Sequence, residues 1–470
     1  MSQKFDFGMV GLGVMGRNLL YNMADNGFSV IGFDLDAEKG KELENGATPG
    51  TTVKGVTTWE EFVSDLATPR KITMLVPAGK PVDSVIESLL PLLEKGDIII
   101  DGGNSHYVDT VRRVKYLEPK GIHFMGMGVS GGESGARRGP SIMPGGDKEA
   151  FEVIKPLLEA VSAKVNGDPC TAYMGKDAAG HYVKMVHNGI EYAIMQLISE
   201  IYDLLHRGLG VTNDELYEIF KEWNEGELSS FLVEITRDIF KQKDPETGGY
   251  LVDYILDKAG AKGTGKWTSQ DAMDSGVSIP TIDIAVSLRT ISAYKEERAQ
   301  AAKLYATSHT PLSVDKAEFI KQAGEALFFA VIISYAQGLA LLVKASQELS
   351  MDIPLKDVVK IWRGGCIIRS TLLEQYYQAY SKNPTLPNIL LDEDIAALAK
   401  SKVASLREVV AQAAKSSIAA GGLQTALAYF DAYTTDRMPT NLIQAQRDFF
   451  GSHTYQRIDK EGTFHTQWGK

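Results

Sequence analysis

A glycine triplet between an apolar run and an amphipathic run constrains the fold of this 470-residue chain more than any other feature. In FDFGMVGLGVMGRNLL, Gly11, Gly13 and Gly16 follow a strand-like segment and open a helix-like one. Glycines in this order permit a tight turn, close approach of a diphosphate to the backbone, and close packing of the helix on the strand. The pattern predicts a dinucleotide-binding βαβ unit whose helix N-terminus faces the diphosphate.

Apolar runs separated by amphipathic stretches recur through the first part of the chain: FDFGMV, VIGFD, KITMLV, DIIID and IHFMGM. This alternation predicts a mostly parallel sheet, and the long 3.6-period segments that follow predict helices. We therefore expect an α/β Rossmann-type domain over residues 1–178, a large all-α domain over 179–437 and a C-terminal tail over 438–470. The last segment, QRDFFGSHTYQRIDKEGTFHTQWGK, shows no helical period, so the tail must dock on something or be disordered.

Two segments of the helical part have similar sequences, IEYAIMQLISE (190–200) and ISYAQGLALLV (333–343). A duplicated helical bundle explains the similarity, and so does shared apolar periodicity; both explanations stay open.

The charge balance of the chain excludes some classes of partner. There are 49 Lys and Arg against 60 Asp and Glu, a net charge of −11, which argues against nucleic acid or an anionic membrane. A small anionic ligand needs only a local cationic cluster. Cys170 and Cys366 show no metal-ligand spacing, and MSQKFDFGMVGLG contains no signal-peptide core, so we expect a metal-free cytoplasmic protein.

One uncharged segment is long enough to test the expectation that the protein is not a membrane protein. ALFFAVIISYAQGLALLV (326–343) reaches the ~18 residues of a membrane span. Ser334, Gln337 and Gly338 interrupt it, and no second span accompanies it. A buried central helix is the expectation.

The acid that ends VIGFD bears on the choice of nucleotide. Asp34 lies about twenty residues beyond the first glycine, where a carboxylate would hold the ribose hydroxyls of NAD. Asp36 adds a second negative charge, with Lys39 and Lys41 further on. The 2′-phosphate of NADP beside a carboxylate would cost on the order of 4 kcal/mol per charge pair. The sequence predicts that NAD is preferred and that NADP is the alternative.

In KMVHNGIEY, Lys184, His187, Asn188 and Glu191 share one helix face. Taken alone, this face fits a structural helix with an intrahelical ion pair equally well. Two glycine-rich loops, DGGNS (101–105) and VSGGESGARRGP (129–140), follow predicted strands, which is where ligands bind in open α/β sheets. The combination favours a site for a polyol and its carboxylate.

Together with GARRGPSIMPGG, KGTGKWT, ISYAQG, WRGGCIIRS and NLIQAQRDFFGSHTY, these blocks resemble the decarboxylating 6-phosphogluconate dehydrogenase family over nearly the whole chain. The resemblance implies oxidative decarboxylation of 6-phosphogluconate to ribulose 5-phosphate and CO2, with hydride transfer to NAD(P)+ and no metal. It also implies a homodimer with shared active sites, in which the C-terminal segment reaches the partner subunit's site.

The resemblance also implies residue roles. Lys184 matches the general base that later acts as an acid, and Glu191 matches the acid that protonates C1. Substrate-orienting positions match Asn104, Ser130, Gly131, Gly132, His187 and Asn188. Phosphate-binding positions match Tyr192, Lys262, Thr264, Arg289, Arg447 and His453. Cofactor-binding positions match Gly11, Leu12, Gly13, Val14, Met15, Gly16, Asp34, Leu35, Asp36, Val76, Pro77, Ala78 and Asn104.

The sequence departs from NADP-dependent members of that family at the cofactor site. Those members carry Asn-Arg-Thr in place of Asp34, Leu35 and Asp36, commonly Ala in place of Gly13, and a lysine near Pro77. These departures point to a change of nucleotide. Two alternatives stay open: a 3-hydroxyacid dehydrogenase of the 3-hydroxyisobutyrate type, which has a shorter helical domain, and a non-catalytic NAD-binding sensor.

A further glycine-rich motif is not expected to bind a nucleotide triphosphate. Residues Gly260 to Trp267 read GxxxxGKW, but a tryptophan stands where a P-loop needs a hydroxyl for Mg²⁺.

Overall fold

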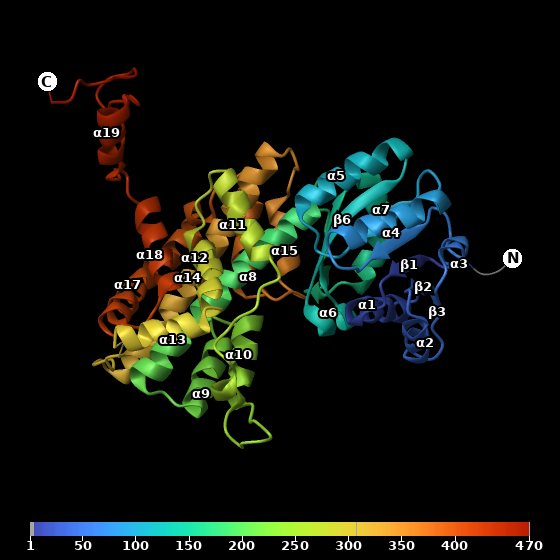
Figure 1. Ribbon diagram of the computed structural model, residues 1–470, viewed down its shortest axis with the longest axis horizontal. Helices are drawn as coiled ribbons and strands as arrows, with labels where there is room; N and C mark the ends of the chain where they lie inside the picture. Colours follow the sequence, from blue (N-terminus) through green and yellow to red (C-terminus); the bar gives the residue numbers. More distant parts are fainter. Residues whose placement is uncertain (1–3, 307, 470) are drawn as a thin grey trace.

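The N-terminal part of the chain is a seven-stranded sheet, and the remainder is almost entirely helical (Figure 1). The computed structural model describes residues 4–306 and 308–469. The strand order is β3-β2-β1-β4-β5-β6-β7, with β7 antiparallel to β6 and every other pairing parallel. The strands are β1 (Phe7–Val10), β2 (Val30–Phe33), β3 (Val53–Val56), β4 (Lys71–Met74), β5 (Ile98–Asp101), β6 (His123–Ser130) and β7 (Ser141–Gly146).

Helices cover both faces of this sheet because successive strand residues point to opposite sides and both sides are apolar. In β1, Met9 joins one hydrophobic cluster and Val10 joins the other; in β5, Ile98 and Ile99 divide in the same way. The covering helices are α1 (Val14–Asp25), α2 (Ala37–Asn45), α3 (Trp59–Ser64), α4 (Lys80–Leu89), α5 (Tyr107–Leu117), α6 (Gly132–Arg138) and α7 (Lys148–Val161). The expected Rossmann-type fold is confirmed.

The strands β3 and β7 were not among the apolar runs of the sequence. β3, VKGV, lies at one edge of the sheet and is only partly buried, so its sequence needs few apolar residues. β7, SIMPGG, carries Pro144 and two glycines, which strands normally avoid. It is the terminal strand at the other edge, where proline is tolerated.

The helical part surrounds two long helices, α8 (Ala179–Asp203) and α14 (Lys316–Glu348), which pack against each other. A two-stranded ladder, β8 (Lys164–Val165) with β9 (Asp168–Pro169), precedes it. The other helices are α9 (Asn213–Asn224), α10 (Phe231–Lys241), α11 (Thr264–Asp274), α12 (Pro280–Ser292), α13 (Lys295–Leu304), α15 (Leu355–Trp362), α16 (Leu372–Lys382), α17 (Glu393–Lys415), α18 (Gly421–Tyr433) and α19 (Thr440–Gly451).

The uncharged segment of the sequence forms the middle of α14. This helix is long and apolar enough to cross a membrane, but 83% of its most apolar window is buried by the rest of the protein. It is therefore the central core helix of this part. The two similar segments lie in α8 and α14, and their common origin stays a prediction.

The C-terminal tail contains a helix that the sequence did not predict. The segment from Gln446 was expected to be non-helical, but its first six residues complete α19. So few residues are too short to show a period. Figure 1 shows α19 standing clear of the other helices, at the end of the molecule away from the sheet. Its apolar side chains face outward, with Phe450 73% exposed and Leu442 62% exposed.

Candidate active site

The glycine triplet forms the turn between β1 and α1. Gly11 has a φ of 96°, and a Cβ there would lie 2.7 Å from Leu75 O. A Cβ at Gly16 would overlap Gly11 O, so the helix packs directly on the turn. At Gly13, in contrast, a Cβ would meet no atom within 4 Å. The turn thus presents bare backbone to open space at the N-terminus of α1, which fits the diphosphate of a dinucleotide. Leu12, Val14 and Met15 complete this segment.

Asp34 is held at the end of β2 by backbone amides. Leu12 N donates to its Oδ2 at 2.9 Å, and Asp36 N donates to its Oδ1 at 3.1 Å. Lys39 Nζ lies 3.3 Å from Oδ2, closer than its place in the sequence suggested. Burial raises the pKa of Asp34, but these hydrogen bonds and the lysine charge outweigh it, so the net pKa is lowered. Asp34 is therefore a fixed carboxylate beside the glycine turn.

The two residues after Asp34 have different surroundings. Leu35 is 84% exposed. The Asp36 carboxylate accepts a hydrogen bond from Glu38 N at 3.0 Å and caps the N-terminus of α2. The carboxylates predicted to disfavour a 2′-phosphate thus lie together at this edge, with one lysine nearby.

Val76, Pro77 and Ala78 connect β4 to α4 and lie against the DGGNS loop, which follows β5. A Cβ at Gly103 would lie 2.6 Å from Val76 O, so the two loops are in contact. Asn104 has a φ of 55°, in the left-handed region. Its Oδ1 is buried without a hydrogen-bond partner in the described chain. Because an unpaired buried carbonyl oxygen is costly, this atom is placed to accept a hydrogen bond from a ligand.

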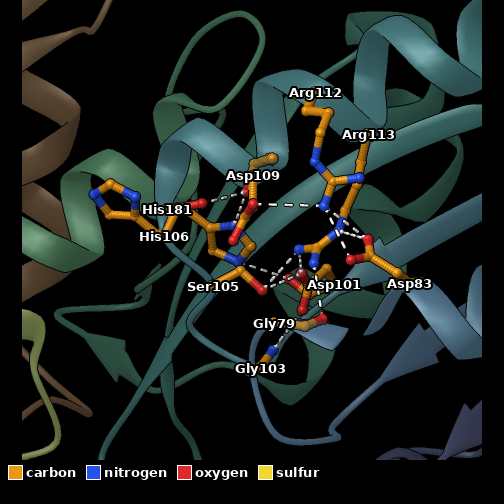
Figure 2. Close-up of polar contacts among 11 residues, drawn as sticks. Gly79, Asp83, Asp101, Gly103, Ser105, His106, Asp109, Arg112, Arg113 and His181 are labelled. Atoms are coloured by element: carbon orange, nitrogen blue, oxygen red, sulfur yellow. Dashed lines mark hydrogen bonds and ion pairs between the residues drawn. The ribbon is translucent and has the colours of Figure 1, made fainter. Parts of the chain in front are cut away.

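The Asp101 carboxylate holds the DGGNS loop through hydrogen bonds (Figure 2). Ser105 Oγ donates to its Oδ2 at 2.6 Å, and Gly103 N donates to its Oδ1 at 2.9 Å. The main-chain oxygen of Asp101 lies 2.9 Å from His181 Nε2, and Thr110 Oγ1 lies 2.7 Å from His181 Nδ1. The loop that carries Asn104 is thereby tied to the first turns of α8.

Helix α8 lies directly on the sheet because glycines line the contact. A Cβ at Gly128 in β6 would overlap Cβ of Lys184, and a Cβ at Gly180 would overlap Gly126 O. These contacts were not predicted from the sequence. The signal for them is the two glycines in the strand run HFMGMGVS, since glycine inside a strand often marks close backbone approach.

The predicted catalytic groups come together on α8. Lys184 is 5% exposed, and its Nζ lies 3.4 Å from His187 Nδ1. His187 Nδ1 is also 3.1 Å from Asn188 Oδ1 and 3.8 Å from Glu191 Oε2. In the described part of the chain, no Lys184–Glu191 ion pair is formed, so the purely structural explanation of this helix face loses its main support.

Burial moves the two key pKa values toward each other. It lowers the pKa of Lys184, and the nearby charge of Glu191 opposes this only in part. Burial likewise raises the pKa of Glu191, against the opposing charges of Lys184 and Arg289. Burial and the charge of Lys184 lower the pKa of His187, which favours its neutral imidazole. A neutral amine and a protonated carboxyl group are thus both favoured relative to the free side chains.

The 129–140 loop lies over this helix face from the end of β6. Ser130 Oγ is 3.3 Å from His187 Nε2. Gly131 precedes α6 with a φ of 115°, and a Cβ there would lie 2.6 Å from Gly365 O. Gly132 begins α6. The loop thus meets the face of α8 at His187 and packs against the WRGG segment of the helical part.

The predicted phosphate-binding residues divide into two groups. The Arg289 guanidinium of α12 lies 3.7 Å from the ring centroid of Tyr192, and a Cβ at Gly265 of α11 would lie 2.6 Å from the same ring. Thr264 begins α11, and Lys262 precedes it at an exposed position. Tyr192 is the residue after Glu191 on α8, so Arg289 and the start of α11 lie beside the Glu191 end of this helix face.

Arg447 and His453 form the second group, and the fold does not bring them to the first. Both are exposed, and Arg447 donates to Gln444 Oε1 at 3.1 Å within α19. Asp448, which is buried, holds the segment that follows α19 against this helix. It accepts hydrogen bonds from Thr454 N at 2.9 Å and from the Trp468 indole at 2.8 Å. The tail displays Arg447 and His453 away from its own Lys184 (Figure 1).

Over residues 4–306 and 308–469, no three His, Cys, Asp or Glu side chains are grouped closely enough to hold a metal ion.

Comparison with known proteins matches the whole chain. Residues 6–175 match the NAD binding domain of 6-phosphogluconate dehydrogenase, and residues 180–468 match the 6-phosphogluconate dehydrogenase C-terminal domain. The chain is 54% identical over 468 residues to the NADP(+)-dependent, decarboxylating 6-phosphogluconate dehydrogenase of Bacillus subtilis, covering 99% of this chain and 100% of the relative. It is 50% identical to the decarboxylating enzyme of Escherichia coli K12, covering 99% of both.

A solved structure agrees. The 6-phosphogluconate dehydrogenase of Plasmodium falciparum, determined in its apo form and in complexes with NADP+ and with 6-phosphogluconate, superimposes with a TM-score of 0.96 at 45% identity, covering 98% of this chain and 100% of that chain. The chain belongs to the 6-phosphogluconate dehydrogenase family.

Proposed function

We propose that the protein converts 6-phosphogluconate to ribulose 5-phosphate and CO2, with NAD+ as the preferred hydride acceptor. The observation that carries the proposal is the buried face of α8, where Lys184 and Glu191 have pKa values shifted toward neutrality. The near-full-length match to relatives named for this activity supports it.

Lys184 acts first as a base. Its amine, favoured in the neutral form by burial, takes the proton of the C3 hydroxyl group while the C3 hydride departs. A bound nicotinamide dinucleotide supplies the hydride acceptor. The resulting 3-keto acid loses CO2 because the carbonyl lies β to the carboxylate and accepts the electron pair. Protonated Lys184 stabilises the enolate that forms.

Glu191 then acts as an acid. Its raised pKa favours the protonated carboxyl group, which delivers a proton to C1 of the enediol to give the ketose. Ser130, His187 and Asn188 orient the hydroxyl groups of the substrate, and the amides of Gly131 and Gly132 face its carboxylate. Asn104, with its unpartnered Oδ1, is the shared contact of substrate and nucleotide.

The preference for NAD+ rests on Asp34. Its carboxylate is fixed beside the glycine turn and accepts two amide hydrogen bonds, which favours ribose hydroxyls over a 2′-phosphate. Asp36 adds negative charge, although Lys39 offsets part of it. Because the Bacillus subtilis relative is named NADP(+)-dependent, this preference would separate the two proteins.

The phosphate end of the site requires a second copy. Tyr192, Lys262, Thr264 and Arg289 of one subunit are completed by Arg447 and His453 of the partner's tail. The protruding α19 and its exposed Phe450 support this arrangement. We accordingly propose a cytoplasmic homodimer with a nucleotide domain over 1–178, a substrate and dimerisation domain over 179–437 and an exchanged tail over 438–470.

The test is absorbance at 340 nm with 6-phosphogluconate and either NAD+ or NADP+ at matched concentrations. We expect rapid reduction of NAD+, slow reduction of NADP+, one CO2 per turnover, and the same rate in excess EDTA. Reduction with 3-hydroxyisobutyrate instead would favour the shorter hydroxyacid dehydrogenases. If neither 6-phosphogluconate nor 3-hydroxyisobutyrate supports reduction of the nucleotide while NAD+ still binds, a non-catalytic sensor would be favoured.

A further inference from the structure

Arg113 of α5 is a buried cation that the proposed mechanism does not use. Its side chain is 1% exposed, and Figure 2 shows it at the centre of a polar network beneath the active-site loops. Nη2 donates to Gly79 O at 3.0 Å, and Nη1 donates to Ser105 Oγ at 3.1 Å. Nη1 also lies 3.4 Å from Asp101 Oδ2, while Nε donates to Asp83 Oδ1 at 2.8 Å.

These contacts join two loops with different tasks. Gly79 ends the loop of Val76, Pro77 and Ala78, which lies at the nucleotide position. Ser105 ends the DGGNS loop, which carries Asn104. A single planar guanidinium therefore contacts both loops, Gly79 through Nη2 and Ser105 through Nη1.

The same network continues to the catalytic helix. The Asp101 carboxylate that faces Arg113 holds Ser105 and Gly103, and the Asp101 main-chain oxygen meets His181. His181 lies on α8, one turn before Lys184. Arg113 is thus connected, through one residue, to both the loop and the helix that must be aligned for hydride transfer.

We propose that Arg113 is a positioning residue that sets the distance between the nucleotide loop and the substrate loop. This inference rests on the proposed function. Without the guanidinium, the two loops lose their shared support, and the buried Asp101 carboxylate loses its paired charge. Lysine at this position keeps a charge but cannot bond along two edges at once.

The neighbouring Arg112 provides a matched control. Its side chain is 54% exposed, and its Nη2 donates to both oxygens of Asp83, at 2.9 and 3.0 Å. It shares Asp83 with Arg113 but touches neither Gly79 nor Ser105 in the described chain. Arg113→Lys and Arg112→Lys therefore make the same change one residue apart, and only the first removes the loop contacts.

Two readouts test the proposal. We expect Arg113→Lys to lower kcat on the order of 10²-fold, because misalignment near 1 Å has effects of that size, with a smaller change in KM for either ligand. The isotope effect with 3-deuterated 6-phosphogluconate should rise as hydride transfer becomes limiting. Amide exchange in peptides covering 76–79 and 101–105 should quicken about tenfold. Arg112→Lys should change each readout less than about twofold.

Equal behaviour of the two folded variants would overturn the proposal. If Arg113→Lys does not fold, Ser105→Ala decides, because it removes the Arg113 contact and the Asp101 hydrogen bond of this loop and keeps the buried charge pair. Wild-type-like kcat and exchange in that variant would also overturn it. Amide exchange needs no turnover, so failure of the positioning role is distinguishable from failure of the proposed function, which would appear as an inactive wild-type protein.

Discussion

The two ends of the active site are built in opposite ways. The nucleotide end is formed by neighbouring strand ends of one chain, and its carboxylate Asp34 is anchored within a single βαβ unit, by Leu12 and Asp36. The proposed phosphate end draws on α8, α11 and α12, while Arg447 and His453 lie on a tail that points away. We therefore expect the choice between NAD+ and NADP+ to change with substitutions in one βαβ unit. Substrate binding should instead depend on assembly of the proposed dimer.

The largest effect should come from the groups between these ends. Lys184→Met removes the base while keeping the length and burial of the side chain. We expect kcat to fall on the order of 10⁴-fold, with NAD+ and 6-phosphogluconate still bound, because general base catalysis is lost and the ligand contacts remain. Steady-state turnover and calorimetric binding measure the two parts. Turnover within tenfold of wild type would refute the role of Lys184.

The next prediction tests whether each active site is built from one chain or from two. Arg447→Ala combined with His453→Ala should lower kcat/KM for 6-phosphogluconate on the order of 10³-fold, since two charged contacts to phosphate are lost. Mixing and refolding this variant with Lys184→Met should restore about a quarter of wild-type activity, because random pairing makes half of the dimers mixed and each mixed dimer has one intact site.

The mixing experiment has a clear negative outcome. If Arg447 and His453 served the site of their own chain, no mixed dimer would contain a complete site and activity would stay at the level of the separate variants. The Lys184→Met protein refolded alone is the control.

A third change tests the local character of the nucleotide end. Asp34→Asn, Leu35→Arg and Asp36→Thr together remove two carboxylates and add one guanidinium. We expect the ratio of kcat/KM for NADP+ to that for NAD+ to rise on the order of 10²-fold, with the KM for 6-phosphogluconate unchanged. A wild-type preference for NADP+ would show that Lys39 outweighs the carboxylates, and Lys39→Gln would then reverse it.

The smallest effect concerns pH. The Glu191 charge raises the pKa of Lys184 against the larger effect of burial. Glu191→Gln removes that charge together with the proposed acid, so turnover should fall as well; in the residual activity the pKa of Lys184 should be lower still, and its neutral form should extend to lower pH. The limb of the kcat/KM profile that rises as Lys184 loses its proton should move toward acid. A shift toward alkaline pH would contradict the electrostatic coupling.

How much of this site can be predicted from the sequence depends on the range of each interaction. The face of α8 follows from the offsets between Lys184, His187, Asn188 and Glu191, because a helix fixes them. The glycine turn and Asp34 follow from a single βαβ unit. The ion pair of Lys39 with Asp34 could not be predicted, because it depends on how Asp36 caps α2 and turns the helix.

Interactions between elements that are distant in the sequence are still harder to predict. Arg113 and Arg112 are adjacent and chemically identical, and only the packing of α5 against the loop after β4 makes one of them central and the other peripheral. The contact of Gly128 with Lys184 requires knowledge of which helix lies on β6. The proposed phosphate-binding residues were predicted from the resemblance alone, since nothing in their spacing links them.

The glycine-lined contact between α8 and β6 also has a consequence for the order of events in catalysis. Where Gly180 meets Gly126, no side chain separates the two backbones, so the helix of Lys184 and the sheet that carries the nucleotide loops form one rigid support, and little sliding is available to either. A nucleotide that arrives first finds Lys184 already in place. In the proposed dimer, the partner's tail lies outside this rigid support, so closure of the site, and the release of product that must reverse it, would be governed by the phosphate rather than by the nucleotide.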